Sequence, residues 1–135
     1  MLINRLFKIM SLKIEATVKT PLIEFDAEKG LISIQGISIP EDPQEFFMPL
    51  DEQLNEYINT PNEKTYLEFK LEYFNTSTTL IIRNLIRKLH EISNKTKLNV
   101  KWYYESDDED MEEAGDEFKM LFKNIDFDII GVEKF

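Results

Sequence analysis

The sequence predicts an α/β fold: one domain whose mixed sheet has an antiparallel N-terminal hairpin and parallel strands joined by helices, packed mainly on one face. Three observations support this. The length of 135 residues suits a single domain. Apolar residues alternate with a period of two or recur at helical spacing, in the order strand, strand, strand, helix, strand, helix, strand, helix, strand. A helix separates each of the last strands from the next, and such crossovers join parallel, right-handed neighbours.

The first residues are set apart from this pattern. Residues 1–12 have apolar positions at helical spacing, but Arg5 and Lys8 interrupt them, and the stretch is too short to span a bilayer. We expect a flexible N-terminal extension at 1–12, with a basic amphipathic anchor as the alternative. A single domain then occupies 13–135.

The first strands are expected at 14–26 and 31–39. Pro21 interrupts the earlier stretch, because proline cannot donate to a strand ladder. In the later stretch the apolar phase changes after Gly36, which indicates a β-bulge.

A helix is expected to begin at Asp42. Asp42 is a suitable cap, Pro43 fits the first helical position, and Glu45 completes a capping box. Apolar residues then recur at helical spacing up to Ile58. Pro49 lies within this run, and we expect it to kink the helix or separate its first turn.

The next strand, 65–74, alternates clearly. Its polar residues Glu68, Lys70 and Glu72 face one way, while Leu67, Phe69, Leu71 and Tyr73 face the other. A strand that is polar on one side indicates that the helices cover mainly the opposite face of the sheet. The remaining elements are expected as a helix at 76–93, a strand at 98–104, a helix at 107–124 and a strand at 127–133.

The negative charge is concentrated in one segment. Residues 105–117 contain nine carboxylates and no base, whereas the rest of the chain has 17 acidic and 16 basic residues. One explanation for this concentration of charge is that carboxylates such as Asp108 and Asp110 stabilise the start of a helix. The other explanation is that the segment forms a surface that binds a basic partner. A calcium loop beginning at Asp108 is excluded, because its sixth position is Glu113 rather than glycine.

The composition excludes several kinds of site. The chain has no cysteine and one histidine, so it lacks a thiol nucleophile, a cysteine zinc site and a two-histidine metal site. No nucleophile constellation accompanies His90. The formal net charge of −10 argues against nucleic-acid binding. We expect a cytoplasmic, non-enzymatic binding or regulatory domain with no cofactor and no membrane span.

The junction at residues 73–79 carries four consecutive hydroxyl residues, Thr76 to Thr79. One interpretation is helix capping by Asn75 or Thr76, with first-turn hydroxyls on free N–H groups. The other is a phosphoacceptor, because the positive end of a helix tolerates an added phosphate. If the strands 65–74 and 98–104 are parallel, this junction and the acidic segment share one edge of the sheet.

Several motifs in a fixed order resemble the SiaC family of bacterial regulatory phosphoproteins, over about residues 15–131. They are TPLIEFD at 20–26, GISIPEDPQEFFMPL at 36–50, LEYFNTS at 71–77, VKWYY at 100–104 and DEDMEEAG at 108–115. The resemblance implies a fold similar to STAS domains and anti-sigma-factor antagonists.

The resemblance also implies a function. Members of the family are non-enzymatic switches that a serine/threonine kinase phosphorylates and a metal-dependent serine/threonine phosphatase dephosphorylates. The unphosphorylated form binds and activates a diguanylate cyclase, within cyclic-di-GMP signalling. The family threonine matches Thr76, flanked by Asn75, Ser77 and Thr78, with Asp108 and Asp110 as expected partner-binding residues. The alternative is a constitutive interaction or scaffold domain without phosphorylation.

Overall fold

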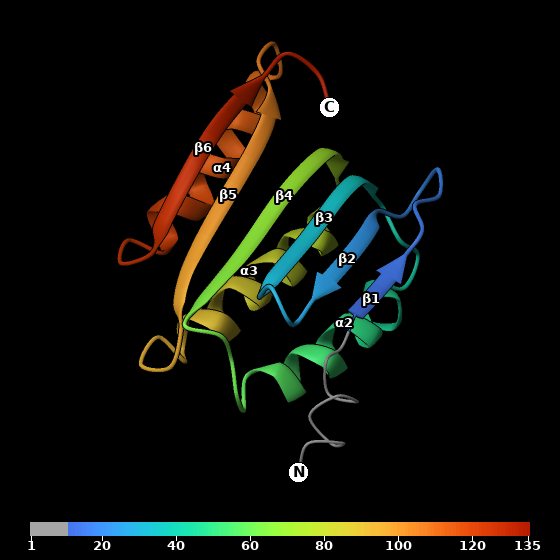
Figure 1. The fold of residues 1–135 in the computed structure, drawn as a ribbon. Helices are drawn as coiled ribbons and strands as arrows, with labels where there is room; N and C mark the ends of the chain where they lie inside the picture. Colours follow the sequence, from blue (N-terminus) through green and yellow to red (C-terminus); the bar gives the residue numbers. More distant parts are fainter. Residues whose placement is uncertain (1–10) are drawn as a thin grey trace.

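The computed structural model describes residues 11–135 and contains a single six-stranded sheet (Figure 1). The strands lie side by side in chain order. Their bounds are β1 Ser11–Ile14, β2 Leu22–Asp26, β3 Leu31–Ser38, β4 Lys64–Phe74, β5 Lys97–Glu105 and β6 Asp126–Val132. The helices are α2 Pro43–Tyr57, α3 Thr76–His90 and α4 Glu109–Leu121.

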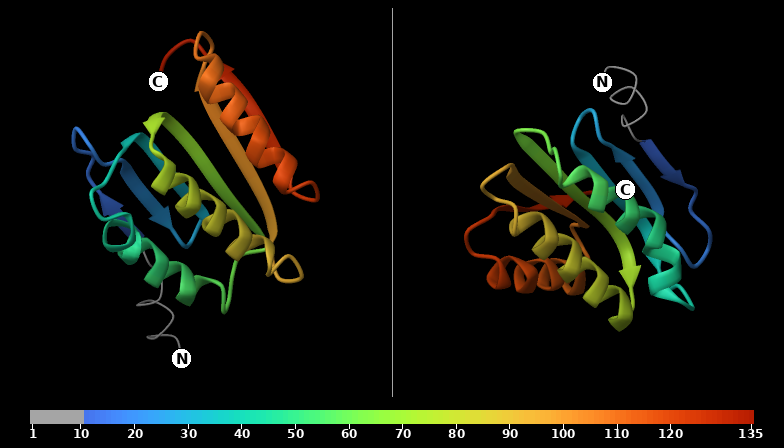
Figure 2. Two further views of the ribbon diagram at one scale, coloured as in Figure 1. Left: turned by 180° about the vertical axis from the view of Figure 1, so that it is seen from behind. Right: turned by 90° about the horizontal axis from the view of Figure 1, so that it is seen from below.

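The sheet is mixed as predicted. β1, β2 and β3 pair antiparallel, and β3 to β6 pair in parallel. All three helices cover the same face of the sheet, which leaves the other face open (Figure 2). The three helices follow β3, β4 and β5, which are parallel to one another. All three helices therefore begin at the edge of the sheet where these strands end. The predicted fold class is therefore confirmed.

The N-terminal boundary differs from the sequence prediction. Ser11 and Leu12, which were expected in the extension, pair with Asp26 and Phe25 as the start of β1. Leu12 is half-buried on the helix side, so its apolar contact explains why the strand begins here. The rest of the predicted extension, residues 1–10, lies outside the described residues.

Pro49 does not divide α2. The helix runs without a break from Pro43 to Tyr57, with Asp42 as its cap. Buried Phe47 and Leu50 on either side of Pro49 hold both halves against the sheet. The proline itself is exposed, so the backbone carbonyl that loses its partner can be hydrated.

The predicted bulge exists, but it lies on the neighbouring strand. Gly36 pairs with Leu71 and Ile37 pairs with Tyr73, so Glu72 of β4 is the extra residue. Beyond it the facing of β4 reverses, which leaves Tyr73 57% exposed instead of inward. Gly36 has a φ of 109°, a conformation that favours glycine.

Trp102 is at the centre of the core between the sheet and α4. Its side chain is fully buried, and its indole N–H donates to the carbonyl of Met111 at 2.9 Å. Gly115 faces the indole so closely that an added Cβ would lie 2.4 Å from Trp102 Cδ1. The absence of a side chain at residue 115 therefore sets how closely α4 packs on β5.

We predict that Gly115→Ala destabilises the domain although alanine is the better helix former. The contact with Trp102 should cost about 1–3 kcal/mol in the free energy of unfolding, which exceeds the helix-propensity gain of about 1 kcal/mol. Urea unfolding of the wild type and the variant measures this. The cost should shrink when Trp102 is also changed to phenylalanine. A stabilised Gly115→Ala variant would contradict the packing argument.

Candidate functional site

The candidate site lies at the edge of the sheet where the parallel strands end. β4 and β5 are parallel, as expected, so the start of α3 at Thr76 and the start of α4 at Glu109 lie at the same edge (Figure 2, left). The hydroxyl run and the acidic segment therefore share one edge, as the sequence predicted.

Asn75 is the cap of α3, rather than Thr76. Its side-chain oxygen accepts from the Thr78 N–H at 3.1 Å and from the Ser77 hydroxyl at 2.9 Å. Its own N–H donates to the carbonyl of Ser38 at 3.1 Å, which attaches the helix start to the end of β3. Thr76 is thus the first residue of the helix, with its side chain free of the capping role.

Thr78 is the buried hydroxyl of the run. Only 1% of the residue is exposed, and its Oγ1 lies 2.9 Å from the hydroxyl of fully buried Ser38. The same oxygen lies 3.2 Å from the Ser38 carbonyl and 3.0 Å from Asn75 Oδ1, either of which can accept its hydrogen. Thr78 therefore stabilises the start of α3 from within the core, and its buried side chain has no surface that a partner could contact.

The four hydroxyls differ sharply in their surroundings. Thr76 is exposed, Ser77 and Thr79 are half-buried, and Thr78 is buried. Since the Ser77 hydroxyl also donates to Asn75, Thr76 is the member of the run that an approaching protein meets first.

The acidic segment has both a structural and a surface part. Asp108 caps α4, because its carboxylate accepts from the Met111 N–H at 3.1 Å. Asp110 is exposed in the first turn. Together with Glu105, Asp107 and Glu109, these residues line an open polar hollow of about 410 Å³. Within residues 11–135, no three acidic or histidine side chains are grouped to hold a metal ion.

Tyr104 links β5 to the same helix. Its hydroxyl donates to Glu112 at 3.1 Å. This hydrogen bond, followed by desolvation and the charges of Glu112 and Asp116, raises the pKa of the Tyr104 hydroxyl.

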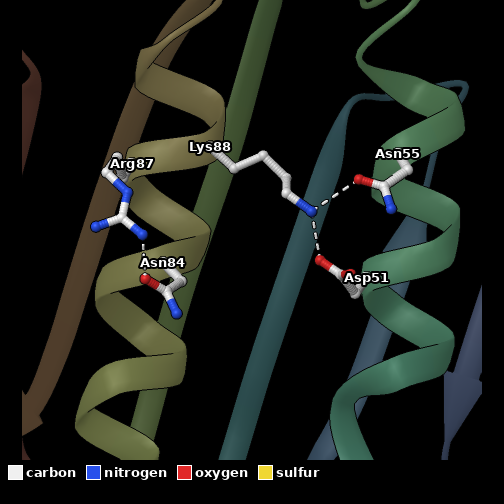
Figure 3. A network of polar contacts seen from close by, with 5 residues as sticks. All are labelled: Asp51, Asn55, Asn84, Arg87 and Lys88. Atoms are coloured by element: carbon white, nitrogen blue, oxygen red, sulfur yellow. Dashed lines mark hydrogen bonds and ion pairs between the residues drawn. The ribbon is translucent and has the colours of Figure 1, made fainter. Parts of the chain in front are cut away.

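Two grooves flank α3. The α2/α3 groove, of about 350 Å³, contains Met48 and Ile81, and Lys88 crosses it to bind Asp51 and Asn55 (Figure 3). The Lys88 contacts tie the two helices together across this groove.

The α3/α4 groove has a volume of about 300 Å³. Its walls and floor are Phe74, Thr79, Arg83, Ala114, Glu117 and Leu121, together with Phe118. Leu121 is a large apolar residue but is 59% exposed, because α4 turns it toward this groove.

Several residues of the site were not singled out from the sequence. Ser38 was missed because the bulge was assigned to β3, although unbroken alternation from Ile32 and Ile34 places it inward. Arg83 was also missed, although it lies four residues after Thr79 on one side of α3, which is a detectable helical spacing.

Comparison with known proteins gives consistent results. A family model described as SiaC family regulatory phosphoprotein matches residues 14–132. The uncharacterized protein PA14_02130 of Pseudomonas aeruginosa strain UCBPP-PA14 is 28% identical over 109 residues, which cover 80% of this chain and 86% of that protein.

Solved structures share the fold. Apo-SiaC from Pseudomonas aeruginosa superposes with a TM-score of 0.76 at 24% identity, over 90% of this chain and 97% of that one. A chain in the crystal structure of the diguanylate cyclase SiaD in complex with its activator SiaC, from the same organism, has a TM-score of 0.72 at 26% identity, covering 88% and 96%. Among residues 11–135, no helix has the length and apolar character needed to cross a membrane.

We predict that Thr78→Val costs far more stability than Thr76→Val, although both remove the same hydroxyl. At residue 78 the change leaves buried Ser38 without a partner, which should lower the free energy of unfolding by about 1–3 kcal/mol. At exposed residue 76 the effect should stay within about 0.5 kcal/mol. Chemical denaturation of both variants checks this, and equal costs would show that the Ser38 network is unimportant.

Proposed function

The chain belongs to the SiaC family of regulatory phosphoproteins, and we propose that it is a non-enzymatic switch whose unphosphorylated form binds and regulates a diguanylate cyclase. The complex of the cyclase SiaD with its activator SiaC supports this, since the matched chain there shares the fold over most of its length. The proposed output is therefore control of cyclic-di-GMP synthesis through protein contact.

We propose Thr76 as the residue that a serine/threonine kinase phosphorylates and a metal-dependent phosphatase dephosphorylates. The observation that carries this assignment is exposure: of four consecutive hydroxyl residues, Thr76 is the exposed one. Asn75 and Thr78 hold the helix start in place on both sides of it. An enzyme can therefore reach the hydroxyl without unfolding the helix.

A phosphate on Thr76 is compatible with the fold. It would add about −1.5 to −2 charges at the positive end of α3, where an exposed anion gains about 0.3–1 kcal/mol. The same edge also carries exposed Asp110 and the acidic hollow around it. Phosphorylation would thus strengthen a local negative field without disrupting the domain, which suits a reversible switch.

The alternative is a constitutive interaction domain with the same fold. It is favoured by the capping network, since Asn75 and Thr78 explain most of the polar residues at the junction without any phosphate. The two proposals differ in whether Thr76 is modified and in whether the modification changes binding.

We predict that the cognate kinase modifies Thr76 alone. Intact mass should rise by one phosphate in the wild type and in the Ser77→Ala and Thr79→Val variants, but not in Thr76→Val. These neighbouring variants are the controls, because they preserve a hydroxyl at residue 76. Phosphate mapped to Ser77 or Thr79, or none on any residue, would overturn the assignment.

We predict that phosphorylation weakens binding to the cyclase, and that added salt reduces the effect. Titrations would compare the unmodified, phosphorylated, Thr76→Ala and Thr76→Glu proteins at two salt concentrations. Thr76→Ala should bind like the unmodified protein, while Thr76→Glu should be intermediate, since a carboxylate has less charge than a phosphate. Exposed charges are screened beyond about 8–10 Å at ordinary salt. Equal affinities throughout would favour the constitutive domain.

A further inference from the structure

We draw no further inference here: the strongest candidate, the uncovered face of the sheet (Figure 2) with exposed Tyr73 on β4 and the Lys70 ammonium 5.1 Å from the centre of the Tyr103 ring, carries nothing because no part of residues 11–135 shows what covers it.

Discussion

The hydrogen bonds among Ser38, Asn75 and Thr78 determine how the functional edge of this domain is arranged. They join the end of β3 to the first turn of α3, in a position where both Ser38 and Thr78 are buried. Successive residues of a helix are 100° apart, so a buried Thr78 requires Thr76 to face outward. One buried hydroxyl pair therefore decides which of four neighbouring hydroxyls reaches the surface.

A second constraint is the placement of all three helices on one face of the sheet. α4 is held close to β5 by the fit of Trp102 against Gly115, and α3 is held at its start by Thr78. Each helix is thus anchored to the sheet separately. The space between α3 and α4 remains open as the α3/α4 groove.

These two constraints suit a switch that works without a conformational change. The body of the chain is almost neutral, and the acidic segment supplies a field at the edge that carries Thr76. The phosphate proposed at Thr76 would act on that field directly, since Thr76 lies at a helix start that tolerates negative charge. The proposed regulation is therefore electrostatic and local, and the packed core has no part in it beyond holding the helices in place.

The sequence by itself determined the order of the elements, the parallel pairing of the later strands and the helix start at Asp42, while it left Asn75 and Thr76 as alternative caps of α3. These features follow from local periodicity and capping, which act over a few neighbouring residues. It also indicated a bulge beside Gly36 and a shared edge for Thr76 and the acidic segment.

Only the tertiary structure decided which strand carries the extra residue, because a register shift belongs to a pair of strands and Glu72 shows no local sign of it. It also decided the unbroken course of α2 through Pro49, where packing on the sheet outweighs local preference. The burial of Thr78 depends on Ser38, 40 residues away, and the close approach of α4 to β5 depends on Gly115 facing Trp102. Contacts between distant parts of the chain fix these features, so no pattern of neighbouring residues specifies them.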